Sequence, residues 1–213
     1  MLDRRDIVRL AAVGLFAAVP VSRAMASAGL SAGERLNQAG PEADLLAGRT
    51  GRWLVTESAW SAPGAVPVTT SGLIAVRRMM GTLSQEIIRP AGDDESRDVR
   101  RTDLLTFNRL EGRWDYMSFD TRGPDGMMVA WSRDRGGNGS IVLDFAPFAS
   151  PRPGPDAVGQ FLRLDQVIRF VDEDHDVKEQ YFSPADGSDV RWLGHRYNYK
   201  RMPDHSSSAA AGH

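Results

Sequence analysis

Glu57 and Arg77 are two residues whose types and positions could do chemistry together. If the stretch around residue 55 is a strand, the side chains of Trp53, Val55 and Glu57 share one face. A carboxylate on a buried face needs a partner or a raised pKa, and Arg77 or Arg78 on the next stretch is the natural partner, because adjacent strands lie ~4.8 Å apart. In an apolar pocket such a pair would recognise an anion or a carbonyl group. The alternatives are a purely structural ion pair and a Glu57 that lies at the rim or outside.

Aromatic and polar residues on later stretches could line the same pocket. Tyr116 and Trp131 could stack on a flat hydrophobic ligand, or they could simply fill a core. Gln166 is the lone polar residue among alternating apolar residues of the stretch 161–171, where it would orient a ligand or satisfy buried backbone groups. The candidate ligand-binding residues are therefore Trp53, Glu57, Arg77, Tyr116, Trp131 and Gln166.

Other motifs lack the partners that their chemistry needs. Residues 29–33 match the G-x-S-x-G nucleophile elbow, but that motif needs a buried strand before it and a helix after it, so a chance match is favoured. The acidic turn 172–176 starts like a calcium loop, yet Val177 and Ser183 stand where such a loop has Gly and Glu. His195 is the only histidine well inside a predicted strand. We therefore predict no metal site, and the sequence identifies no cofactor.

Composition narrows the class of protein. The chain has 213 residues, 41% of them hydrophobic and 25% charged, which is typical of a soluble globular protein. Lys and Arg number 26 against 28 Asp and Glu, and no dense basic run occurs beyond the N-terminus, so nucleic-acid binding is not expected. The absence of cysteine excludes disulfides and thiolate chemistry.

Short alternating strands must position the candidate residues. Turn residues such as those at 111–112, 123–126 and 136–139 separate the strands and predict antiparallel hairpins. The proline-rich stretch 148–159 is expected to cross one end of the sheet. We predict an all-β fold, a single antiparallel meander β-barrel of about ten strands, with a sandwich as the alternative. The expected strands are 52–60, 67–77, 82–89, 98–108, 113–121, 127–134, 139–146, 161–171, 176–183 and 189–200.

The N-terminus has the form of a cleavable signal helix. Arg4 and Arg5 precede an apolar run that ends at Val19 and is far shorter than the roughly 20 residues of a membrane span. The sequence Arg4-Arg5-Asp6-Ile7-Val8-Arg9 resembles a twin-arginine export signal, and a small-x-small pattern predicts cleavage after Ala26. The alternative is an amphipathic or buried helix. The expected organisation is a signal peptide over 1–26, a linker over 27–45 that could contain one helical turn, the barrel over 46–202 and a disordered tail over 203–213.

Several pieces of the predicted barrel resemble a known family. Gly51-x-Trp53 resembles the G-x-W start of lipocalins and other calycins, and the order of the later pieces is similar to an uncharacterised bacterial family of lipocalin-like domains of unknown function. The resemblance covers residue 46 to about 202 and implies a barrel with an interior pocket and Trp53 pointing inward; it implies no activity. Related calycins include haem-binding nitrobindins, whose histidine context has no match here. The later pieces are Gly72-x4-Arg77 with Met80-Gly81, Thr106-Phe107-Asn108, residues 112–118, residues 168–175 and Tyr197-Asn198-Tyr199-Lys200-Arg201.

Three functional hypotheses follow from this sequence. The first is an exported periplasmic or secreted protein that holds a small hydrophobic or amphipathic ligand in one pocket of ~300–1,000 Å³, without a stable membrane span after signal cleavage. The second is a barrel enzyme of the isomerase or cyclase type, with Glu57, or next His195, as the acid or base. The third is a structural or interaction module with a filled barrel and an apolar outer patch. Ligand identity and oligomeric state are open.

Overall fold

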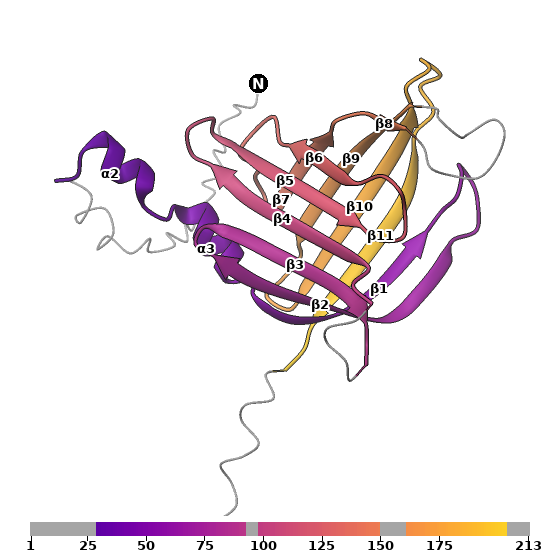
Figure 1. The fold of residues 1–213 in the computed structure, drawn as a ribbon, viewed down its shortest axis with the longest axis horizontal. Coiled ribbons are helices and arrows are strands. Elements are labelled where there is room, and N and C mark those ends of the chain that lie inside the picture. Colours follow the sequence, from indigo (N-terminus) through magenta and orange to yellow (C-terminus); the bar gives the residue numbers. More distant parts are fainter. Residues whose placement is uncertain (1–28, 93–97, 150–160, 204–213) are drawn as a thin grey trace, which may run out of the picture. The chain divides into compact units, whose positions relative to one another are not determined.

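The described part of the protein consists of β-strands and two short helices (Figure 1). A computed structural model describes residues 29–92, 98–149 and 161–203. The predicted signal peptide lies outside the described residues, as does the predicted tail from residue 204 onward. The strands are β1 (Gly51–Ala59), β2 (Val68–Met80), β3 (Leu83–Pro90), β4 (Arg101–Asn108), β5 (Arg113–Asp120), β6 (Met127–Trp131), β7 (Ser140–Phe145), β8 (Phe148–Ala149), β9 (Phe161–Phe170), β10 (His175–Pro184) and β11 (Trp192–Arg201).

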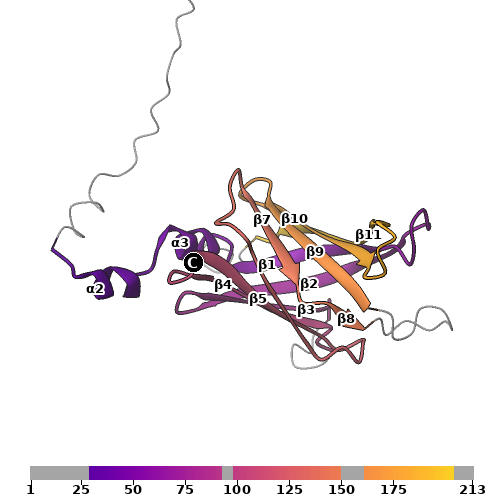
Figure 2. The ribbon, with the colours of Figure 1, turned by 90° about the horizontal axis from the view of Figure 1, so that it is seen from above.

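Ten of the described strands close into an antiparallel barrel. They pair in the order β10-β11-β1-β2-β3-β4-β5-β6-β7-β9, and β9 pairs back onto β10. Strand β8 has two residues and adds to β9 beside β7. Figure 2 shows β7, β9 and β10 on one side of the barrel and β3, β4 and β5 on the other. The predicted all-β fold and its antiparallel meander are confirmed.

The two ends of the barrel differ. At one end, where β1 begins and β11 ends, lies α3 (Pro41–Ala47), which packs against β2, β3 and β4. This helix begins with Pro at its first turn, where a missing N–H costs no hydrogen bond. Its Leu46 is 3% exposed and belongs to the barrel core. We call this the α3 end, and the opposite end, where β1 ends and β9 begins, the β8 end.

The N-terminal linker prediction differs from the structure in its helices. Two short helices occupy the stretch for which one turn was expected, α2 (Ala32–Asn37) and α3. Ser31, the serine of the G-x-S-x-G match, caps α2: its Oγ accepts a hydrogen bond from the N–H of Glu34, whose carboxylate accepts one from the N–H of Ser31. Helix α2 belongs to a compact unit that ends at Gln38, and the barrel unit starts at Ala39.

Two apolar clusters form the core of the barrel, as strand alternation predicts. The larger one draws on α3, β4 to β7, β9 and β10, and the smaller one draws on β1, β2, β3 and β11. Trp53 is fully buried in the smaller cluster, which confirms the inward Trp predicted for the first strand. Buried polar side chains lie among these apolar residues, and they are unusual enough to define the candidate site. They include Glu57, Glu86, Arg101, Asp103, Gln166, Asp176, Lys178 and Gln180.

Candidate functional site

Lys178 spans the barrel from β10 to the opposite wall. Its Nζ lies 2.7 Å from Oε1 of Glu86 on β3 and 2.6 Å from Oδ2 of Asp103 on β4. In the order of the closed barrel, β10 and β4 are five strands apart, so this ammonium bridges opposite sides of a ten-strand ring. Arg101 continues the bridge, because its Nε donates to Oδ1 of Asp103 at 2.8 Å. Its Nη2 and Nη1 lie 2.9 and 3.1 Å from the oxygen of the Gln180 amide when that amide is oriented with its oxygen toward the guanidinium.

These charges remain ionised although they are buried. Burial opposes ionisation of Asp103, but Arg101 and Lys178 outweigh it and hold the pKa of this carboxyl well below its usual range. Burial likewise opposes the charge of Lys178, but Asp103 and Glu86 raise the pKa of its ammonium well above the ordinary value. We call the buried bridge the central polar layer, and its members are Glu86, Arg101, Asp103, Gln166, Lys178 and Gln180.

Arg77 lies on the α3 side of this layer and does not pair with Glu57. Its Nε donates to Oε2 of Glu86 at 2.6 Å, and it also forms an ion pair with Asp176. The guanidinium lies between the rings of Trp53 and Tyr199, 4.7 and 4.5 Å from their centroids. The expected partnership is corrected by the strand register, which places Arg77 opposite Gly51 and Glu57 opposite Thr70, so the two side chains lie near opposite ends of β1.

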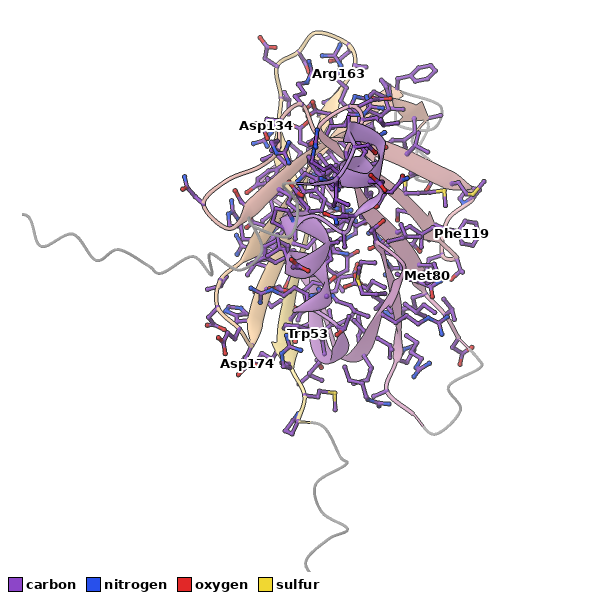
Figure 3. The ribbon with its side chains drawn as sticks, turned by 90° about the vertical axis from the view of Figure 1, so that its left-hand side faces the viewer. Trp53, Met80, Phe119, Asp134, Arg163 and Asp174 are labelled. Atoms are coloured by element: carbon purple, nitrogen blue, oxygen red, sulfur yellow. The ribbon has the colours of Figure 1, made fainter. Side chains whose placement is uncertain are left out.

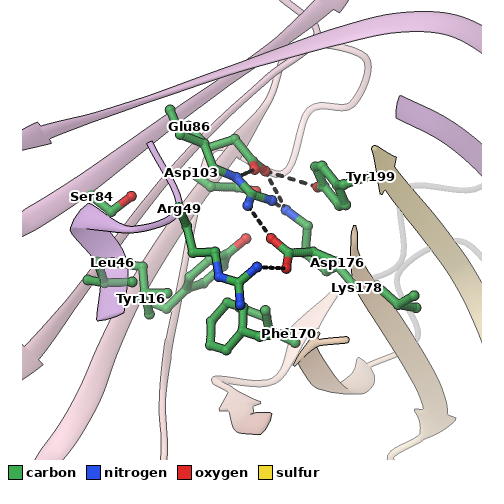
Figure 4. A pocket seen from close by; sticks show the side chains of 14 residues that line it. Leu46, Arg49, Ser84, Glu86, Asp103, Tyr116, Phe170, Asp176, Lys178 and Tyr199 are labelled. Atoms are coloured by element: carbon green, nitrogen blue, oxygen red, sulfur yellow. Dashed lines mark hydrogen bonds and ion pairs between the residues drawn. The ribbon is translucent and has the colours of Figure 1, made fainter. Parts of the chain in front are cut away.

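A small cavity of about 50 Å³ lies at the α3 end (Figure 4). Arg49 and Phe170 line it together with Asp176 and Lys178, and Leu46 of α3 closes one side. Oδ1 of Asp176 accepts a hydrogen bond from Arg49 at 3.1 Å. This volume suits ordered water rather than an organic ligand, because it is far below the ~300–1,000 Å³ of small-molecule sites.

A larger cavity of about 290 Å³ lies at the β8 end. One wall is apolar and the other carries polar and charged groups that converge on the same space. The cavity shares no lining residue with the cavity at the α3 end, since the central polar layer lies between them. The apolar wall is Met128, Phe148, Leu162, Leu164 and Phe182, and the polar wall is Arg101, Asp120, Arg122, Asp125, Gln180, His195 and Tyr197.

Glu57 organises the polar wall from behind. Its carboxylate accepts hydrogen bonds from Nη1 of Arg122 at 2.9 Å and from the hydroxyl of Tyr197 at 2.9 Å, and its Oε1 lies 3.1 Å from Nδ1 of His195. Burial opposes ionisation, but His195 and Arg122 outweigh it and hold the pKa of Glu57 well below its usual range. Burial also raises the pKa of Tyr197 to about 12, so its hydroxyl remains a donor. Glu57 is thus an ionised positioning group.

The remaining candidate residues are placed in three different environments. Tyr116 is buried, lines the cavity at the α3 end and accepts a hydrogen bond from Nη2 of Arg101 at 3.2 Å. Gln166 is fully buried in the central polar layer, where its amide lies 2.8 Å from that of Gln180. Trp131 lies on the outer face, 37% exposed, with the guanidinium of Arg113 over its ring. The structure therefore does not bring the six predicted residues into one cavity.

The sequence analysis did not identify the buried charged residues inside the barrel. Asp176 ends the acidic turn, Lys178 lies in the expected strand 176–183, and Asp103 lies among the alternating residues of β4. The sequence did contain a signal for these residues. Alternation along β10 places Asp176, Lys178 and Gln180 on the same face as the apolar Phe182. A lysine and an aspartate on an inward face are rare enough to predict mutual neutralisation.

No group of three or more His, Cys, Asp or Glu residues in the described part of the chain is placed to hold a metal ion. The acidic turn 172–176 forms the tight connection between β9 and β10, where the backbone N–H of Asp174 donates to the Asp172 carboxylate at 2.9 Å. None of the described helices is both long and apolar enough to cross a membrane.

Comparison with known proteins shows a shared fold. No protein-family model matches the sequence, and no curated protein matches it. The crystal structure of Rv2717c from M. tuberculosis is similar, with a TM-score of 0.50 and 14% sequence identity over 78% of this chain and 100% of that chain. At this identity the likeness shows the fold alone.

Proposed function

We propose that the protein binds a small amphipathic molecule in the cavity at the β8 end. The observation that carries this proposal is the division of one cavity into an apolar wall and a polar wall. Its volume of about 290 Å³ is close to the lower end of the ~300–1,000 Å³ of small-molecule sites. Phe148 and Phe182, which meet edge to face with centroids 6.3 Å apart, would contact the apolar body of the ligand.

The polar wall would orient the other end of the ligand. Arg101 and Gln180 belong to the central polar layer, and His195 and Tyr197 are held by Glu57, so these groups have little freedom to move. A wall fixed before binding costs little entropy when the ligand arrives.

Export is the second part of the proposal. Its support is the N-terminal sequence, with Arg4 and Arg5 before a short apolar run and the small-x-small pattern that ends at Ala26. The protein would then act in the periplasm or outside the cell. N-terminal sequencing of protein recovered from the exported fraction tests this part, and an intact Met1 would contradict it.

A pair of substitutions on one strand tests the binding site. Met128 lines the cavity, whereas its neighbour Val129 is 46% exposed on the outer face of β6. Met128→Trp should fill the cavity and weaken binding of N-phenyl-1-naphthylamine, measured by its fluorescence, about tenfold or more, which corresponds to ~1.4 kcal/mol. Val129→Trp should bind as the wild type does. Equal affinity for all three proteins, or no binding by the wild type, would contradict the proposal.

The alternative functions are supported less by these contacts. Glu57 is a poor general acid or base because its pKa lies well below its usual range, and efficient catalysis needs a pKa near the working pH. An interaction module would show an apolar outer patch without a pocket. Phe119, Met127 and Val129 do expose apolar surface on the outer face of β5 and β6, and Phe119 projects outward in Figure 3, but the cavity is present as well.

A further inference from the structure

We propose that His195 accepts a proton from an acidic hydroxyl group of the bound molecule, so that the ligand class is a weak acid with an apolar body, such as a phenol or an enol. This inference rests on the proposed binding cavity and deepens it, because it assigns the ligand's polar group and the residue that meets it. It follows from the arrangement of hydrogen bonds around the imidazole ring.

The ionised state of Glu57 fixes which nitrogen of His195 carries the proton. A carboxylate can only accept hydrogen bonds, and Oε1 of Glu57 lies 3.1 Å from Nδ1 of His195. Nδ1 must therefore be the donor, and in the neutral ring Nε2 is left with a lone pair. A carboxylate that fixes the tautomer of a histidine in this way is a recurring device in proton transfer.

Nε2 is the free nitrogen of the ring and is available to the cavity. Among the described residues it has no hydrogen-bond partner, while the side chain lines the cavity and is 20% exposed. The ring itself is held in place, because it stacks on Tyr197 with an interplanar angle of 15° and meets Phe182 edge to face, with centroids 6.0 and 5.9 Å away. A ligand whose apolar body contacts Phe182 would thus bring its polar end to Nε2.

Charged side chains surround the imidazole ring on several sides. Glu57 on β1 faces Nδ1, and Arg122 and Asp120 stand beside it at the mouth of the cavity, where Arg122 donates to both carboxylates. Asp125 lines the same mouth, and burial together with Asp120 raises its pKa. The neighbouring strand β10 contributes the neutral Gln180, and β4 across the barrel contributes Arg101, which forms an ion pair with Asp103.

The proposed step is a single proton transfer. The O–H bond of the ligand breaks, an N–H bond forms at Nε2, and the electron pair stays on the ligand oxygen. The products are an oxyanion and an imidazolium. Across the ring from the oxyanion, the imidazolium faces the Glu57 carboxylate, so its positive charge is compensated within the protein.

Two matched probes test this proposal. 4-Nitrophenol ionises to a coloured anion, and 4-nitroanisole has nearly the same shape without the acidic hydroxyl. Wild-type protein should bind both, and near neutral pH it should increase the ratio of nitrophenolate to nitrophenol about tenfold, seen as visible absorbance. His195→Gln should lose this increase. Glu57→Gln should reduce the increase, and His175→Gln serves as a control that retains it, because His175 lies at the α3 end and does not line the cavity.

The outcomes separate the two proposals. Failure of the wild type to bind nitroanisole would contradict the proposed cavity function. Binding of nitroanisole with no extra nitrophenolate, or an unchanged increase in His195→Gln, would overturn the role of His195 alone. A readout without any substitution is the ¹⁵N spectrum of the histidine rings in the wild type. Only the ring of His195, one of four histidines, should convert to imidazolium when nitrophenol is added.

Discussion

Replacing Lys178 with Met would remove the positive charge that joins opposite walls of the barrel. In the wild type this ammonium contacts the carboxylates of Glu86 and Asp103, and all three side chains are buried. Loss of one partner of a buried ion pair costs about 3–5 kcal/mol, because a buried charge is left without compensation. We expect a loss of stability at the lower end of this range, about 3 kcal/mol, because Arg77 still binds Glu86 and Arg101 still binds Asp103.

Thermal unfolding measures this loss. For a barrel of this size, about 3 kcal/mol corresponds to a fall in Tm of roughly 6–12 °C. The pKa values of Glu86 and Asp103 are lowered in the folded protein, so their stabilising effect is present above the ordinary carboxyl pKa of ~4 and is lost as the pH falls below it. The difference between the wild type and Lys178→Met should therefore be largest near neutral pH and shrink in acid.

A matched control and a repair variant make the result decisive. Lys200→Met removes the other lysine of the chain, which is exposed, and should change Tm by no more than a degree or two. The double variant Lys178→Met/Glu86→Gln should recover part of the lost stability, because Arg77 keeps its ion pair with Asp176 and Arg101 keeps its ion pair with Asp103. A Lys178→Met protein as stable as the wild type at neutral pH would refute the reasoning.

Three further predictions concern packing and accessibility. Gly194→Ala should destabilise the fold by about 1–3 kcal/mol in chemical denaturation, because its Cβ would lie 1.9 Å from Cδ2 of Phe182; unchanged stability would show that the ring moves freely. Reductive methylation of the folded protein, followed by mass spectrometry, should modify Lys200 and spare Lys178, and equal labelling would contradict the buried bridge. Acrylamide should quench the fluorescence of Trp131 readily, so Trp131→Phe should lower the quenchable fraction of the emission; no change would place this indole inside.

Alternation and turn chemistry were sufficient to predict the strands. Trp53, Val55 and Glu57 share the buried face of β1, as alternation predicted. Leu162 and Leu164 likewise lie on the buried face of β9. Strand β8 could not be expected, because its two residues stand at the edge of a proline-rich stretch and depend on pairing with β9. A two-residue strand has no period of its own.

The site was predicted less well, because register and closure decide which charges meet. Glu57 was correctly placed among buried residues, but its partner Arg122 comes from a turn 65 positions later in the chain. Lys178 meets Glu86 only because the ring of strands closes between β9 and β10. Trp131 was expected inside, yet the alternation of the short strand β6 puts Ala130 in the core and the indole outside.

The central polar layer determines the path by which a ligand could enter and leave the barrel. Lys178, Arg101 and their carboxylates cross the barrel, so they divide its interior into two cavities and leave no continuous channel. A ligand that binds at the β8 end would have to leave at the same end, because the cavity at the α3 end has a volume of only about 50 Å³ and is separate from it. Entry and release of such a ligand would therefore use one opening.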